Sequence, residues 1–259
     1  GSSVANAPVG DVIVTASNSA LQLLGEATGR ITADGQSIAV DVVLQSSAVS
    51  LPLSTPLQDA YGQTYTLQRN GSVTGGNGSV FNAGAMVLDI VRDGTPTRFT
   101  GSQAGVYEDG RREIAVTQTG IAGINVTRKL YVPANGYFGR WVEMLSNPST
   151  EPITVDVRVS AQLSNFYFSG TLRPVATSSG DTTLDAGDLW AVIDDSNPAD
   201  PYVSGNFPPI AFVMGGPGAA VGVGSASLTT SNNLVAYEWR QVTVPAGTPS
   251  CFTDSGGTG

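Results

Sequence analysis

Strict alternation of apolar and polar residues is the feature that most limits how this chain can fold. Residues 153–160 (ITVDVRVS) carry a β-branched apolar side chain at every second position, and residues 124–132 (INVTRKLYV) repeat the pattern with Arg128 on the apolar face. Successive side chains of a strand point to opposite faces, so a period of two predicts half-buried antiparallel strands. We find no window of 12 or more residues with helical periodicity. The chain is therefore expected to be all-β.

Short turn signals separate these runs. Asp93-Gly94 and Asp109-Gly110 lie between alternating segments, Asn135-Gly136 follows residues 124–132, and Asn147-Pro148 follows the next apolar run. Asp-Gly and Asn-Gly supply the positive φ angles of tight hairpins. We expect a large antiparallel β-sandwich with few or no helices. Residues 81–259 would form its main part, and residues 1–80 would supply N-terminal strands as an edge or exchanged segment of the same domain.

The composition removes much of the chemistry available to proteins. The 259 residues include no histidine and one cysteine, Cys251, which has no partner for an internal disulfide. Histidine is the usual general base near neutral pH and the commonest metal ligand, so a Ser-His-Asp triad, a Cys-His dyad and a histidine zinc site are excluded within this chain.

Charge and hydropathy bound the partners and the compartment. Twelve Lys and Arg residues against 21 Asp and Glu residues give a net charge of −9, which argues against nucleic acid as a partner. No apolar run approaches about 18 residues, so membrane insertion is not expected. The low charged fraction of 13%, with 32 glycines, is typical of extracellular β-proteins, and we expect an extracellular or cell-surface location.

Several phrases of the sequence together resemble a known architecture. They are the runs RKLYVP at 128–133, GRWVE at 139–143, LSNP at 145–148, ITV at 153–155 and WRQVTVPAG at 239–247. Over roughly residues 80–250 the chain resembles the galactose-mutarotase-like supersandwich domains of bacterial extracellular and surface proteins. These motifs consist of strand and turn residues and include no catalytic residue. The related sugar-processing mutarotases use histidines in their site, so the resemblance does not carry that activity to this chain.

An acidic segment is the candidate metal site. Asp194, Asp195, Asn197 and Asp200 could supply the oxygen ligands that calcium prefers, although they lack the spacing and the glycine of an EF-hand loop. The alternative is a solvated loop in which Asp and Asn act as turn formers. Calcium is the one cofactor that the sequence suggests.

Clustered aromatic residues are candidates for glycan binding because aromatic faces stack on sugar rings. The candidates are Tyr137, Phe166, Tyr167 and Tyr202. The alternative is core packing, since alternate aromatic residues in a sandwich must face inward.

No catalytic residue is predicted. A carboxylate pair is the enzyme chemistry that the composition leaves open, and Glu143 and Glu238 each stand near a tryptophan in an expected strand. Both also fit ordinary outward-facing strand residues. Asn70 and Asn77 match the N-glycosylation sequon and would be acceptors only in a eukaryotic or archaeal protein.

The favoured interpretation is a non-enzymatic structural or adhesive module of a surface assembly. Its partners would be further copies of the chain or other surface proteins, with glycans as a further class. In a filament subunit, Val12, Ile13 and Val14 would complete a neighbour's sheet by β-strand addition, unless they form an edge strand of their own domain. The alternatives are a carbohydrate-binding module and a carboxylate-based glycosidase or lyase.

Overall fold

A computed structural model describes residues 8–18, 23–46, 49–74, 81, 84–164, 171–195, 209–247 and 249–258. The elements in these ranges are β-strands with one short 3₁₀ helix, η1 (Asp109–Arg111), which confirms the expected all-β antiparallel class. The chain divides into two compact units, Gly1–Val49 and Ser50–Gly259, and the boundary expected at residue 80 lies inside the second. Among the described residues, no helix is long and apolar enough to cross a membrane.

The smaller unit is a three-stranded sheet in the order β1-β2-β3. Its strands are β1 (Gly10–Asn18), β2 (Leu23–Ile31) and β3 (Gln45–Ser46). β1 pairs with β2 along its whole length, so Val12, Ile13 and Val14 lie in the edge strand of the unit's own sheet. Glycines on β2 let residues 38–43 approach closely, because a Cβ at Gly29 would lie 2.6 Å from the Ile38 side chain.

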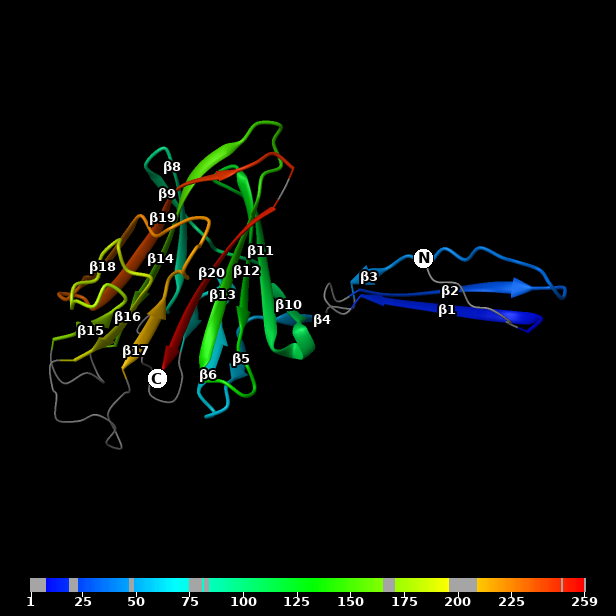
Figure 1. Ribbon diagram of the computed structural model, residues 1–259, viewed down its shortest axis with the longest axis horizontal. Helices are drawn as coiled ribbons and strands as arrows, with labels where there is room; N and C mark the ends of the chain where they lie inside the picture. The colour runs from blue at the N-terminus through cyan, green and yellow to red at the C-terminus, as the bar shows by residue number, and fades with distance from the viewer. Residues whose placement is uncertain are drawn as a thin grey trace. The chain divides into compact units, whose positions relative to one another are not determined.

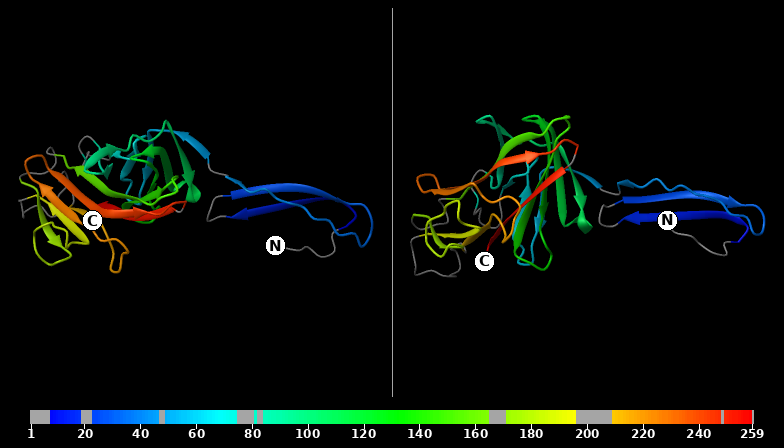
Figure 2. Two further views of the ribbon diagram at one scale, coloured as in Figure 1. Left: turned by 90° about the horizontal axis from the view of Figure 1, so that it is seen from above. Right: turned by 45° about the horizontal axis from the view of Figure 1, so that its top comes forward.

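The larger unit contains three sheets, two of which form the layers of a sandwich (Figures 1 and 2). The nine-stranded sheet has the order β15-β16-β17-β20-β13-β12-β11-β10-β4. Its strands are β4 (Val49–Pro52), β10 (Ala104–Glu108), β11 (Glu113–Ile121), β12 (Ile124–Tyr131), β13 (Phe138–Ser146), β15 (Arg173–Thr177), β16 (Trp190–Asp194), β17 (Ile210–Val213) and β20 (Pro249–Thr258). The C-terminal strand β20 therefore lies between β13 and β17 in the sheet (Figure 1).

The other two sheets are smaller. The five-stranded sheet has the order β18-β19-β14-β8-β9, and a three-stranded sheet has the order β5-β6-β7. Their strands are β5 (Thr55–Gln58), β6 (Thr64–Leu67), β7 (Val73–Thr74), β8 (Val87–Arg92), β9 (Thr95–Arg98), β14 (Ile153–Gln162), β18 (Ser225–Thr229) and β19 (Leu234–Val244).

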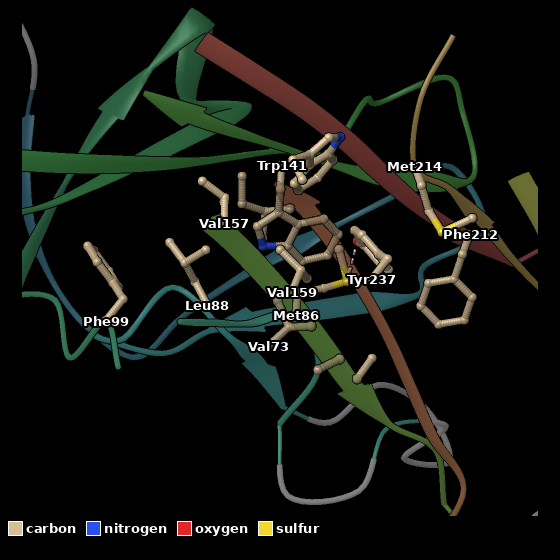
Figure 3. Close-up of a cluster of buried hydrophobic side chains, with 14 of the residues drawn as sticks. Val73, Met86, Leu88, Phe99, Trp141, Val157, Val159, Phe212, Met214 and Tyr237 are labelled. Carbon is tan, nitrogen blue, oxygen red and sulfur yellow. Dashed lines mark hydrogen bonds between the residues drawn. The ribbon is translucent and has the colours of Figure 1, made fainter. Parts of the chain in front are cut away.

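The core forms where the apolar faces of these sheets meet. Residues 153–162 of β14 alternate between buried and exposed or half-buried positions, as their sequence predicts. Val157 and Val159 from β14 pack in one cluster with Leu88 from β8 and Trp141 from β13 (Figure 3). Tyr237 from β19 joins this cluster, and its ring lies edge-on to Trp239, with 5.5 Å between the ring centres.

The predicted Asp-Gly turns occur where the sequence places them. Asp93 and Gly94 join β8 to β9 with φ angles of 50° and 75°, which a two-residue type I′ hairpin requires. Ala122 and Gly123 play the same part between β11 and β12, with φ angles of 51° and 92°. An alanine at positive φ costs backbone energy and is uncommon there. The Ala-Gly sequence therefore did not indicate this second turn.

Candidate functional site

A row of polar side chains crosses the outward face of the nine-stranded sheet. Glu108 of β10 pairs in register with Glu113 of β11, Glu113 pairs with Tyr131 of β12, and Tyr131 pairs with Arg140 of β13. The neighbouring residues Ile114, Leu130 and Trp141 are buried on the core side. Because strand side chains alternate, these four residues share the opposite face, which is the face turned away from the core.

Lys129 ties the acidic end of this row together. It lies two residues before Tyr131 on the same face of β12, and its Nζ forms ion pairs with Glu108 and, at 3.8 Å, with Glu113. Burial raises the pKa of Glu113, Lys129 acts against this shift, and the nearby Glu108 charge adds to it. The row therefore presents a half-buried carboxyl group that takes up a proton more readily than an exposed glutamate.

Arg140 is the cation at the other end of the row. Its guanidinium carbon lies 4.8 Å from the centre of the Tyr131 ring, so the aromatic face holds the group in position. Its Nε atom is buried, and no hydrogen-bond acceptor within the described residues reaches it. An unpaired buried donor is unfavourable, so the Arg140 Nε is a hydrogen-bond donor that the described part of the chain leaves unsatisfied.

An exposed aromatic platform adjoins this row at the end of the β12–β13 hairpin. The rings of Tyr61 and Tyr137 stack with 3.8 Å between their centres and an interplanar angle of 22°. Tyr61 is 78% exposed and Tyr137 is 43% exposed. Phe138 follows Tyr137, is also exposed, and lies two residues before Arg140, so both point to the same side of β13. Tyr61, Tyr137 and Phe138 are called the aromatic platform below.

Asp59 fixes the turn that presents Tyr61. One carboxylate oxygen, Oδ1, accepts hydrogen bonds from the backbone N–H groups of Tyr61 and Gln63, each at 2.9 Å. The Ala60 N–H donates to the Gly136 carbonyl at 3.0 Å and so joins this turn to the β12–β13 hairpin. The aromatic platform is therefore held by the Asp59 hydrogen bonds within one loop and by one backbone hydrogen bond to a second loop that is far away in sequence.

The second oxygen of Asp59 has no partner in the described part of the chain. Asp59 is 7% exposed, and its Oδ2 atom is buried without a hydrogen bond. Burial, reinforced by the Asp59 charge, raises the pKa of Tyr65. Asp59 therefore contributes to this region through Oδ1, which holds the Tyr61 turn.

These groups together suit one kind of ligand chemistry. Aromatic faces bind a flat apolar surface, while Arg140 can donate hydrogen bonds and Glu113 can accept them. A ring with an apolar face and a rim of hydroxyl groups matches this combination. Of the predicted glycan-binding residues, Tyr137 lies in the aromatic platform, and its contact with a glycan stays a prediction. Phe166, Tyr167 and Tyr202 lie outside the described residues.

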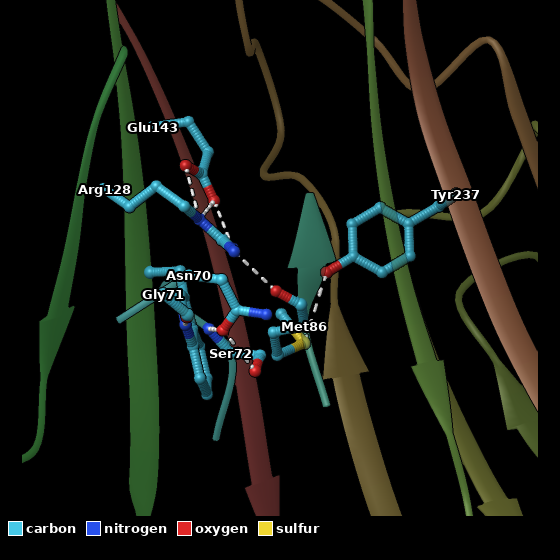
Figure 4. Close-up of polar contacts among 8 residues, drawn as sticks. Asn70, Gly71, Ser72, Met86, Arg128, Glu143 and Tyr237 are labelled. Atoms are coloured by element: carbon cyan, nitrogen blue, oxygen red, sulfur yellow. Dashed lines mark hydrogen bonds and ion pairs between the residues drawn. The ribbon is translucent and has the colours of Figure 1, made fainter. Parts of the chain in front are cut away.

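The carboxylates considered for catalysis are engaged elsewhere. Glu143 accepts three hydrogen bonds from Arg128 in the core, where the two side chains are 0% and 1% exposed (Figure 4). Glu238 lies in the other layer and accepts hydrogen bonds from Arg158 and Arg240, both at 2.7 Å. Each carboxylate is paired with arginine, so neither is a free acid or base.

The other predicted site residues that are described, Asp194, Asp195 and Asn70, are not part of the aromatic platform. Asp194 Oδ1 accepts a hydrogen bond from the Asp195 backbone N–H, whereas Asn197 and Asp200 are outside the described residues, so the calcium site stays a prediction. Within the described ranges, no group of three or more Asp, Glu or Cys side chains is arranged to hold a metal ion. Asn70 Oδ1 accepts hydrogen bonds from the Ser72 backbone and hydroxyl groups, and Asn77 is not described.

Sequence reasoning missed Asp59, Tyr61 and Arg140. Arg140 lies within the GRWVE phrase that carries the resemblance, but nothing local marks its Nε as unpaired. Asp59 and Tyr61 reach Tyr137 only through the hydrogen bond from Ala60 to Gly136. The local signal that was available is Asp59 at the start of an Asp-Ala-Tyr-Gly turn.

Comparisons with known proteins identify the fold. No protein-family model matches the chain, and no curated protein matches its sequence. A solved structure described as a "putative aldose 1-epimerase" from Klebsiella pneumoniae subsp. pneumoniae MGH 78578 matches with a TM-score of 0.53 and 9% identity, over 96% of this chain and 87% of that chain. The Slr1438 protein from Synechocystis sp. PCC 6803 matches with a TM-score of 0.48 and 10% identity, over 80% of this chain and 96% of that one. A second protein described as a "putative aldose 1-epimerase", from Escherichia coli K12, matches with a TM-score of 0.41 and 11% identity, over 96% of this chain and 99% of that one.

The Klebsiella match confirms the resemblance to galactose-mutarotase-like sandwiches. It also overturns the prediction of a structural, adhesive or filament module, because the protein that shares the fold is named for sugar chemistry. That prediction was wrong because it relied on low charge and abundant strands, which describe a durable β-protein and say nothing of its ligand. The fold is thus shared with a protein named as an enzyme.

Proposed function

We propose that this protein binds carbohydrate, and that the aromatic platform with Arg140 and Asp59 forms the binding site. The observation that carries the proposal is the exposed Tyr61–Tyr137 stack, which Asp59 Oδ1 holds in place, together with Arg140, which follows Phe138 by two residues on the same side of β13. Apolar ring faces with a few oriented polar groups are the usual composition of a small-molecule site. The fold shared with a protein named for sugar chemistry supports the same ligand class.

We further propose that the protein binds sugar without epimerising it. The chain has no histidine, and the mutarotases that it resembles use histidines in their site. Glu113 and Lys129 remain as titratable groups near the platform, but Lys129 is paired with Glu108 and Glu113. The low charged fraction favours binding outside the cell or at its surface.

Binding is tested by titration calorimetry with β-1,4-linked gluco-, manno- and galacto-oligosaccharides of one to six units, after a screen on immobilised glycans. Tyr137→Ala should weaken binding by up to about tenfold, given about 0.5–1.5 kcal/mol for a stacking contact, and Arg140→Ala by about tenfold or more, given about 1.5–3 kcal/mol for a charged hydrogen bond. Thr97→Ala, an exposed change on β9 in the other layer, is the matched control. Equal affinity of all variants, or no binding in the screen, would contradict the proposal.

Catalysis is tested separately by NMR, which follows the conversion of α-galactose to β-galactose and, in a second experiment, of α-glucose to β-glucose. We expect the spontaneous rate of the buffer at all protein concentrations. A rate that rises in proportion to the protein and falls in the Glu113→Gln variant would contradict the non-catalytic part of the proposal alone.

A further inference from the structure

The row of register partners that contains Arg140 continues across the same outward face to an exposed tryptophan, Trp190, three strands away. Arg140 of β13 pairs in register with Ser255 of β20, Ser255 pairs with Val213 of β17, and Val213 pairs with Trp190 of β16. Trp190 is 39% exposed and Val213 is 42% exposed. The buried neighbours Ala191 and Phe212 show that Trp190 and Val213 lie on the outward face, as Arg140 does.

The strand between these two groups carries small residues at the relevant positions. Ser255 separates Arg140 from Val213, and in the adjacent row Gly257 separates Phe138 from Ala211. A glycine in a strand often marks a place where another chain or a ligand comes close to the backbone. The sheet face therefore has large aromatic residues on both sides of β20, whose residues in these two rows are Ser255 and Gly257.

Trp190 is held in place by its own loop. Asp188 is buried, and its carboxylate accepts hydrogen bonds from the backbone N–H groups of Ser179 and Asp185, each at 3.1 Å. The Trp190 carbonyl accepts a hydrogen bond from the Ser178 N–H at 3.0 Å. A tryptophan has few side-chain torsions, so it loses less conformational freedom on binding than a long flexible side chain, which favours a role in recognition.

The spacing gives the length of the ligand. Adjacent strands lie about 4.8 Å apart, so three strand spacings separate Trp190 from Arg140 by about 14 Å, and four separate it from Tyr131 by about 19 Å. A single sugar ring is too short to contact both ends. A chain of several sugar units that runs across the strands would contact the aromatic platform and Trp190 at the same time.

We propose that the binding site extends across β20 to Trp190 and takes a carbohydrate chain of several units rather than a monosaccharide. This proposal rests on the proposed function, since it extends the same site. Arg140 lies beside Phe138 on β13 and provides a hydrogen-bond donor at the platform end of the chain.

The test compares ligand length with the position of the mutation. In the same calorimetric titrations, Trp190→Ala should weaken binding of the six-unit chain by about tenfold and leave binding of one- and two-unit sugars unchanged. Tyr137→Ala should weaken binding at every length. Val175→Ser, an exposed apolar change on the adjacent strand β15, is the matched control and should have no effect. Circular dichroism and the melting temperature show whether each variant is folded.

A second readout reports on Trp190 directly. The chain has three tryptophans, and Trp141 and Trp239 are buried, so acrylamide quenching of fluorescence samples mainly Trp190. The six-unit chain should protect it from quenching, and the monosaccharide should not. Affinity that is independent of length, with no protection of Trp190, would overturn the extended site and leave the proposed function intact. Absence of binding at every length would overturn both.

Discussion

Removal of the carboxylate partner from the core arginine should destabilise the protein strongly. In the wild type, Arg128 Nε donates to both oxygens of Glu143 at 2.9 Å, and its Nη2 donates to Oε1 at 2.7 Å (Figure 4). Its Nη1 donates to the Met86 carbonyl at 2.6 Å. In Glu143→Leu the guanidinium would stay buried with that carbonyl as its remaining acceptor.

The expected loss is about 3–5 kcal/mol, the usual cost of leaving one member of a buried ion pair without its partner. Burial raises the pKa of Glu143 and Arg128 acts against this shift, so the pair itself offsets a large desolvation cost. The double variant Arg128→Met/Glu143→Leu removes both charges. It should lie within about 1 kcal/mol of the wild type or be more stable by up to about 4 kcal/mol.

Urea unfolding, followed by far-UV circular dichroism and by the fluorescence of the buried Trp141, measures these differences. Arg30→Met is the control, because Arg30 and its partner Asp11 are 71% and 73% exposed and their pairing should contribute about 1 kcal/mol or less. A loss below about 1 kcal/mol in Glu143→Leu would refute the reasoning. So would a double variant as unstable as the sum of the two single variants.

Three further predictions concern titration and backbone conformation. Burial acts to raise the pKa of Glu238, but hydrogen bonds from Arg240 and Arg158 outweigh it and hold the pKa below its usual value. The ionised carboxylate therefore stabilises the folded state above the unfolded pKa, and this contribution is lost as the pH falls through the folded pKa. A plot of melting temperature against pH below about 5 should be flatter for Glu238→Gln than for the wild type, and parallel curves would contradict this. The contribution of Glu113 to stability depends on pH in the opposite way. Burial raises its pKa in the folded state, so the folded state loses stability as the pH rises from the unfolded-state pKa towards the folded-state pKa. Glu113→Gln should raise the melting temperature at neutral pH and leave it unchanged well below the unfolded pKa, and an equal shift at both would count against the assignment. A Cβ at Gly101 would lie 1.6 Å from the Arg69 carbonyl oxygen at a φ of 66°, whereas one at Gly120, with a φ of 73°, would meet nothing within 4 Å. Urea unfolding should show a loss of about 1–2 kcal/mol for Gly120→Ala from backbone strain alone and about 3 kcal/mol or more for Gly101→Ala, and equal losses would show that the chain relaxes around Arg69.

Local patterns predicted the strands but not the role of every residue within them. The alternation over 153–160 placed Val155, Val157 and Val159 in the core because side-chain direction in a strand depends only on position parity. The same rule put Arg128 on the apolar face, where the structure finds it buried and paired with Glu143. The rule did not identify that partner, because the pairing requires the register between β12 and β13.

The candidate site depends on contacts that no local pattern contains. Tyr137 was expected to be a glycan-binding residue because it belongs to a cluster of aromatic residues, but its stacking on Tyr61 follows from the packing of two segments distant in sequence. The row from Glu108 to Trp190 joins residues on seven strands whose order in the sheet is not their order in the sequence. The missing partner of Arg140 Nε is likewise a property of its three-dimensional surroundings.

The sequence by itself determined the class of fold and removed histidine chemistry, because alternation and composition are properties of the chain alone. The tertiary structure decided which carboxylates are neutralised in the core, which aromatic side chains reach the surface, and where C-terminal strand β20 enters the sheet. These features depend on sheet order and on register. A shift of one residue in register would exchange the two faces of a strand and remove the site altogether.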